Sequence, residues 1–187
     1  MITPYGWLKE SAHKYFFAFL TIINIVLVGI FAFLDQFLKN QIALRGIISF
    51  ELAGSESQAK AIVESWNNYS RDVALFSLGL DYLFLFTYSL GLSFLCYLLA
   101  TKNFSINNSF YKLGIMISWV VLLAGVFDGL ENYALLQILL FSNYIFWPIL
   151  AKYFAIAKFT LLALSLFYII IGVITKLKTL FTSITKR

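Results

Sequence analysis

Long apolar runs, each interrupted by only a few polar positions, make up most of this chain. Four runs are long enough to cross a lipid bilayer, which requires about 20 apolar residues. They cover residues 15–34, 73–100, 113–140 and 145–175. These runs lack the short alternation of apolar and polar positions that marks a membrane-spanning barrel. The pattern therefore predicts an all-α, multi-pass integral membrane protein, with residues 1–187 forming one membrane domain built as a four-helix bundle.

The segment between the first two runs, residues 35–72, is more polar and contains a short amphipathic pattern. Ser55 precedes Gln58 by three residues, which is the spacing of a capping box at the start of a helix. Apolar residues then repeat on one helix face. They are Ala59, Ile62, Val63 and Trp66. We expect a partly helical link that either shields the bundle or forms a lid over a site. Its candidate lid or rim residues are Arg45, Glu51 and Trp66.

Basic residues gather on one side of the four predicted spans. The two tails and the link between the second and third runs together carry eight bases and one acid, a balance of about +7. The segments on the other side carry five bases and five acids. Cytoplasmic segments of membrane proteins hold the excess of Lys and Arg. We therefore expect both termini in the cytoplasm and the 35–72 link outside it.

The composition supports a membrane location. Of the 187 residues, 61% are hydrophobic and 12% are charged, whereas a soluble domain is about half apolar and about a quarter charged. The net charge of +5 comes from the tails and short links that orient the spans, so the expected partner is the lipid bilayer, and no nucleic acid is expected. The abundance of Phe, Ile, Lys and Asn fits an AT-rich genome and favours a bacterial cytoplasmic membrane.

The scarcity of cysteine and histidine excludes several kinds of chemistry. Cys96 is the only cysteine, which excludes an internal disulfide and thiol oxidoreductases that need a CxxC pair. His13 is the only histidine and precedes the first run, so a typical zinc site is excluded as well. Carboxylates could bind Ca²⁺ or Mg²⁺, but Lys158 would compete with the cation. We predict no metal and no cofactor.

Ionisable residues interrupt three of the four predicted spans. A charge at mid-bilayer costs roughly 2.5–3.5 kcal/mol on insertion scales. At about 1.5 Å of rise per residue, Asp81 lies about 12 Å from the outer end of its span and Lys158 about 15 Å. Asp128 and Glu131 lie about 18 and about 13 Å from the outer end of theirs, with Asn132 beside them. These groups are therefore expected in one layer in the outer half of the bundle.

Glycine and hydroxyl residues lie beside these ionisable groups. Gly125 and Gly129 lie on the same side of the third span as the acids, and their spacing allows a neighbouring helix to approach closely. Ser77 shares a helix face with Asp81, and Tyr88 lies further along the same span. The acidic face is therefore expected to point into the bundle. The predicted ligand-binding residues are Ser77, Asp81, Tyr88, Asp128, Glu131, Asn132 and Lys158.

Several functions fit this polar layer. The first is binding of a small amphiphilic or lipid-like ligand, for which the abundant aromatic residues suit an apolar pocket wall. The second is a membrane-embedded enzyme in which Asp81, Asp128 or Glu131 divide the roles of acid and base. The third is a structural or accessory subunit in which Lys158 only pairs with an acid, in a homo-oligomer or with a partner membrane protein. Ion transport is disfavoured because the chain is short and shows no inverted repeat.

Overall fold

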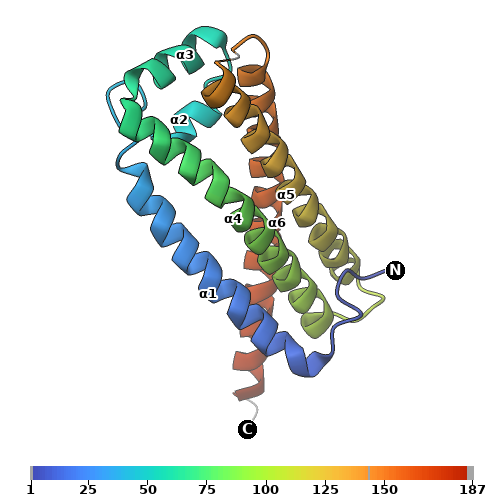
Figure 1. Cartoon of the computed structure of the whole chain (residues 1–187). Coiled ribbons are helices and arrows are strands. Elements are labelled where there is room, and N and C mark those ends of the chain that lie inside the picture. The colour runs from blue at the N-terminus through green and yellow to red at the C-terminus, as the bar shows by residue number, and fades with distance from the viewer. Residues whose placement is uncertain (1, 143, 185–187) are drawn as a thin grey trace.

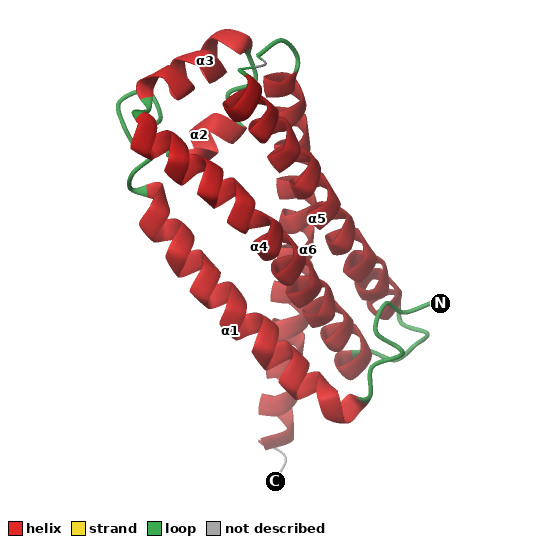
Figure 2. Cartoon of the chain, viewed as in Figure 1, coloured by secondary structure: helices red, strands yellow, loops and turns green. Residues whose placement is uncertain are grey.

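The computed structural model describes residues 2–142 and 144–184, and its regular structure there consists of helices (Figure 2). In chain order they are α1 (Glu10–Asp35), α2 (Ile47–Glu51), α3 (Glu56–Ser65), α4 (Asn68–Asn103), α5 (Ser109–Phe141) and α6 (Trp147–Ile184). Lys186 and Arg187, which contribute to the basic balance of the C-terminal tail, lie outside the described residues.

Four of these helices, α1, α4, α5 and α6, are long and apolar enough to cross a membrane. The all-helical prediction is confirmed for the described residues, and the four long helices agree with a multi-pass integral membrane protein. Each of the four helices extends beyond the apolar run that predicted it at one end or both.

Polar caps explain why α4 and α5 begin before their apolar runs. The side chain of Asn67 accepts a hydrogen bond from the backbone N–H of Ser70 at 2.8 Å. The side chain of Asn108 accepts one from the backbone N–H of Phe110, also at 2.8 Å. Asparagine is favoured at this position because its oxygen satisfies an N–H group that has no partner inside the helix. A hydropathy pattern misses these first turns because they are polar.

The long helices pack as a bundle in which α5 lies between α4 and α6, and α1 packs chiefly against α4 (Figure 1). The distribution of polarity is the reverse of that in a soluble protein. Phe19, Ile22 and Phe33 are exposed on the outside of α1, whereas Asp128 and Lys158 are buried inside the bundle. Lipid favours an apolar outer surface, and polar groups inside a membrane protein turn inward to find partners.

Helices α2 and α3 cover one end of the bundle, while α1 begins and α6 ends at the opposite end (Figure 1). The predicted capping residue of α3 is confirmed, because Ser55 Oγ accepts a hydrogen bond from the backbone N–H of Gln58 at 3.3 Å. The predicted apolar face is also confirmed. Its members Ala59, Ile62, Val63 and Trp66 are all buried.

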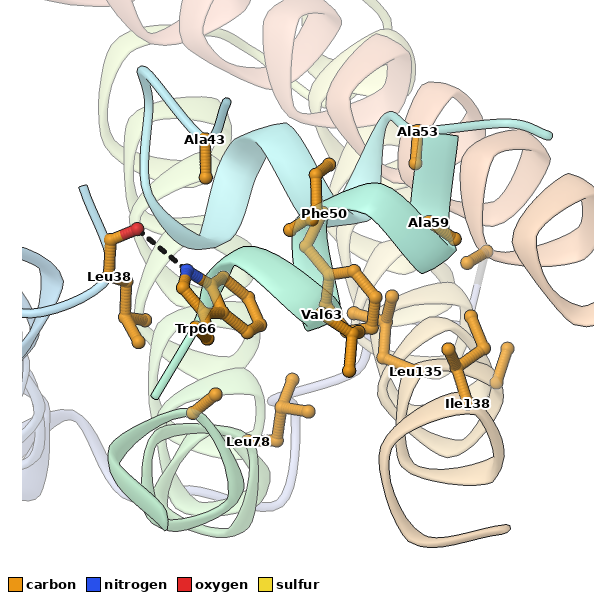
Figure 3. Packing of buried hydrophobic residues seen from close by; sticks show 14 of the residues in the cluster. Leu38, Ala43, Phe50, Ala53, Ala59, Val63, Trp66, Leu78, Leu135 and Ile138 are labelled. Atoms are coloured by element: carbon orange, nitrogen blue, oxygen red, sulfur yellow. Dashed lines mark hydrogen bonds between the residues drawn. The ribbon is translucent and has the colours of Figure 1, made fainter. Parts of the chain in front are cut away.

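This apolar face joins the link to the ends of the long helices (Figure 3). Phe50 of α2 contacts Trp66 with ring centroids 5.4 Å apart, and the same buried cluster includes Leu135 and Ile138 of α5. The indole N–H of Trp66 donates to the backbone carbonyl of Leu38 at 2.9 Å. The link is therefore an ordered cap on the bundle, and α2 is held directly above the long helices.

The two glycines predicted at a helix contact differ in their surroundings. A methyl group at Gly125 would lie 2.9 Å from Ser89 Oγ and 3.3 Å from the carbonyl oxygen of Leu85, both on α4. A methyl group at Gly129 would lie 3.8 Å from the nearest atom of Leu85, which is an ordinary contact. Close approach of α4 and α5 therefore depends on Gly125.

We expect Gly125→Ala to destabilise the protein by about 1–3 kcal/mol, the usual cost of overpacking a filled interior. Gly129→Ala is the matched control, and it should leave stability unchanged or raise it slightly because alanine favours a helix over glycine. Thermal unfolding of both variants in the same detergent measures the difference. Equal unfolding temperatures for the two variants would contradict the assigned contact.

Candidate functional site

The polar residues of α5 point into the bundle. Asp128, Glu131 and Asn132 are separated by three and four positions, so they share one side of the helix. Their relative exposures are 3%, 0% and 2%, which places the whole group inside the protein. Groups this deeply buried need charged or hydrogen-bonding partners, because desolvation is otherwise costly.

Lys158 of α6 supplies the main partner for these acids. Its Nζ lies 2.8 Å from Asp128 Oδ1 and 2.7 Å from Glu131 Oε2. Ala151 and Ala155 on the same face of α6 are fully buried, and their small side chains allow α6 to approach its neighbours. We call Asp128, Glu131 and Lys158 the ionic cluster.

Helix α4 adds two hydrogen bonds to this layer. The hydroxyl of Tyr88 donates to Asp128 Oδ2 at 2.7 Å, so both carboxylate oxygens of Asp128 have partners. The side-chain amide of Asn132 donates to Asp81 Oδ2 at 2.6 Å. The structure thus joins four of the predicted site residues from three separate helices, namely Tyr88, Asp128, Glu131 and Lys158. Asp81 and Asn132 form a second pair between α4 and α5.

Glu51 of α2 reaches the ionic cluster from above. Its Oε2 lies 3.9 Å from Lys158 Nζ, and only 9% of the residue is exposed. Burial raises the pKa of Glu51 above its ordinary value; Lys158 opposes this shift and the negative charge of Asp128 adds to it. Glu51 was expected at a lid or rim, but its approach to Lys158 could not be predicted from sequence spacing.

A cavity of about 490 Å³ lies beside the ionic cluster. Of the predicted ligand-binding residues, Glu131 is absent from its lining. The others line it: Ser77, Asp81, Tyr88, Asp128, Asn132 and Lys158. Glu51 lines it as well, together with Ile47 and Ile48 of α2.

The other two predicted lid or rim residues do not reach this cavity. Arg45 is exposed and lines a separate surface hollow formed by the link. Trp66 is buried in the apolar cluster between the link and the bundle, where its ring packs against Phe50. Trp66 therefore helps to hold α2 in place, and Arg45 is not part of the cavity.

Sequence reasoning missed the wall contributed by α1. Val28, Phe31 and Ala32 line the cavity and lie in an uninterrupted apolar stretch of the first span. Asp35 also lines it; its Oδ1 accepts from the backbone N–H of Ile47 at 3.0 Å, and Oδ2 pairs with Lys39. The acid at the end of an apolar run was the one available signal for this contact.

We expect Lys158→Met to destabilise the protein by about 3–5 kcal/mol, because the change leaves Asp128 and Glu131 buried without their cation. Lys152→Met, on the exposed surface of the same helix, is the matched control and should have little effect. Thermal unfolding in detergent compares the variants. Similar unfolding temperatures for wild type and Lys158→Met would show that the ionic cluster contributes little to stability.

In comparisons with known proteins, no protein-family model matches this chain, and neither a curated protein nor a solved structure matches it. Neither homology nor similarity of fold therefore indicates a function for this chain. The chemistry of the cavity and of the ionic cluster has to carry the functional inference.

Proposed function

We propose that this protein binds a small amphiphilic or lipid-like ligand in the cavity beside the ionic cluster. One observation carries the proposal: the cavity lining combines a few charged side chains with a larger number of apolar ones. Asp81 and Lys158 are among the charged residues, whereas Val28, Leu92 and Leu162 are among the apolar ones. Ligand pockets typically combine mostly apolar walls with a few polar groups that fix the orientation of the ligand.

The volume of the cavity suits such a ligand. At about 490 Å³, it falls within the roughly 300–1,000 Å³ typical of small-molecule pockets. This space accepts a polar head with a short or folded chain, and a longer chain would continue outside it.

The surroundings of the cavity favour entry from the lipid. Val28 of α1 and Phe159 of α6 line the cavity and are also exposed on the outer surface. Ile47 and Glu51 of α2 line it from the link, so that end is covered by protein. An amphiphile could therefore enter sideways between α1 and α6, with its apolar part remaining in the bilayer.

Binding fits the contacts better than acid–base catalysis does. Asp128 and Glu131 both contact Lys158, and Asp128 also accepts a hydrogen bond from Tyr88. A general acid or base needs an oxygen directed at the substrate, whereas both oxygens of Asp128 and Oε2 of Glu131 are directed at other protein groups. Asp128 and Glu131 therefore form a fixed electrostatic support for the cavity.

We further infer that the link faces the outside of the cell and that both termini face the cytoplasm. The two ends of the bundle differ in charge as the positive-inside rule requires. The cavity then lies in the outer half of the membrane, where a ligand would arrive from the outer leaflet.

Filling the cavity should abolish ligand retention. Ala32 lines the cavity on the exposed side of α1, so Ala32→Trp would place an indole into the space without disturbing buried packing. Ala18→Trp, at an exposed position on the same helix, is the matched control. Native mass spectrometry of protein released from mild detergent should detect a reproducible small molecule on wild type and Ala18→Trp, but not on Ala32→Trp.

Two results would contradict amphiphile binding. One is retention of the same molecule by Ala32→Trp, which would place the ligand elsewhere. The other is a wild-type protein that carries no small molecule but retains a second protein in fixed ratio, as an accessory subunit would.

Membrane orientation can be tested with single cysteines. Lys60 of α3 and Asn107 between α4 and α5 are both exposed, at opposite ends of the bundle. In a Cys96→Ala background, a membrane-impermeant maleimide should label Lys60→Cys in intact cells and Asn107→Cys only after permeabilisation. The reverse pattern of labelling would overturn the orientation.

A further inference from the structure

The acids at the cavity outnumber the bases that could neutralise them. Lys158 contacts Asp128 and Glu131 at 2.8 and 2.7 Å, and lies 3.9 Å from Glu51. One lysine thus faces three carboxyl groups even before Asp81 is counted. A region of low polarity that holds surplus negative charge is stabilised by a proton or by a cation.

Asp81 is the acid best placed to bind a cation in the cavity. It lines the cavity and is only half-buried, so one side of its carboxyl group remains accessible. Its Oδ2 accepts a hydrogen bond from Asn132, but a neutral amide cannot balance the charge. Among the described residues, no ion pair to Asp81 within 4.0 Å is present.

Aromatic rings stand beside Asp81 on the cavity wall. Phe84 and Tyr88 follow it at three and seven positions along α4, on the same helix face. Their ring centroids are 5.1 Å apart, and Phe84 also meets Phe31 of α1 at 5.3 Å. Aromatic faces attract organic cations, so the wall that surrounds the acid suits a positively charged nitrogen.

Glu51 provides an independent sign that the cavity is incomplete without a ligand. It is nine-tenths buried and lines the cavity, and its neighbours are the carboxyl group of Glu131 and, at 3.9 Å, Lys158 Nζ. In the described part of the chain its buried Oε2 has no N–H donor within hydrogen-bond distance. Buried polar atoms without a partner are uncommon and indicate a missing group. A donor that enters the cavity would supply that partner.

The rest of the lining indicates what kind of cation fits. Metal ions such as Ca²⁺ and Mg²⁺ take six or more oxygen ligands, and among the described residues no group of three or more His, Cys, Asp or Glu side chains is placed to hold a metal ion. Val28, Leu92 and Leu162 give the lining an apolar part instead. An anionic head is disfavoured because Lys158 is already occupied by two carboxylates. An organic ammonium group attached to an apolar chain suits both the acidic and the apolar residues of the lining.

We propose that the ligand is a cationic amphiphile, whose ammonium group binds at Asp81 between the aromatic rings and whose chain extends between α1 and α6. This inference rests on the proposed function and names its ligand class. Asp81 supplies the negative charge, and Phe84 and Tyr88 flank the nitrogen. Glu51 adds electrostatic attraction to the ammonium group.

Two probes of equal chain length separate the contribution of the positive charge to binding from the contribution of the apolar chain. Tetradecylamine is protonated at pH 7, whereas tetradecanol is neutral. Binding of each to the full-length protein in phosphatidylcholine nanodiscs is measured by native mass spectrometry, and uptake by empty nanodiscs is subtracted. Wild type should bind the amine about tenfold more tightly than the alcohol, the ratio expected for a hydrogen bond to a charged group.

Asp81→Asn should remove this preference while leaving tetradecanol binding intact, so retained alcohol binding shows that the variant is folded. Asp72→Asn, an exposed acid near the start of α4, is the matched control and should bind both probes as wild type does. Glu51→Gln provides a second variant, for which we expect a smaller loss of amine binding because Glu51 lies near Lys158.

The outcomes distinguish the two proposals. If wild type binds both probes equally, or if Asp81→Asn keeps the preference for the amine, the cationic ligand is wrong while the amphiphile cavity stands. If neither probe binds above the empty nanodiscs, the cavity itself is not a site for single-chain amphiphiles and both proposals fall.

Discussion

The structure depends on one lysine. Lys158 meets the two buried acids of α5, and Asp128 carries the connection on to α4 through the hydroxyl of Tyr88. Three helices are therefore joined at one level by charge and hydrogen bonds. Inside a membrane the hydrophobic effect does not press helices together, so packing and polar contacts have to do so. The cost of burying these groups also fixes the register, since sliding any helix would leave a charge without its partner.

Close packing makes these polar contacts possible. Gly125 lets α4 and α5 approach, and Ala155 does the same beside Lys158 on α6. The link contributes from the end of the bundle, where Phe50 and Trp66 hold α2 so that Glu51 points toward the ionic cluster. Small side chains, an aromatic anchor and ionisable groups thus act on the same site from different elements. The cavity is the space that remains beside them, where α1 does not close against α6.

Much of this arrangement could be predicted from the sequence. The rest could not, because it depends on contacts that the sequence pattern does not encode. The apolar runs predicted the long helices, and the capping spacing at Ser55 predicted α3. Depth along each span placed Asp128 and Lys158 at one level, and the structure brings them into contact. Sequence periodicity did not show which face of α1 meets the cavity, because residues 25–34 around that wall are apolar and only Asp35 at their end is polar. It also could not show that α2 brings Glu51 inward, since this depends on contacts between distant parts of the chain.

The first helix has a further consequence for how the protein would behave. Few of its residues are buried, namely His13, Leu20 and Leu27, and it packs chiefly on α4. Local opening occurs first where few contacts oppose it, so α1 is the element that separates from the bundle at the lowest free energy. A ligand that touches Phe31 on one side and Phe159 on the other would bridge a seam that the protein itself leaves open. The bound molecule would then pack between α1 and α6 as an interior side chain does. The free energy needed to separate α1 from the bundle would therefore be higher when the cavity is occupied.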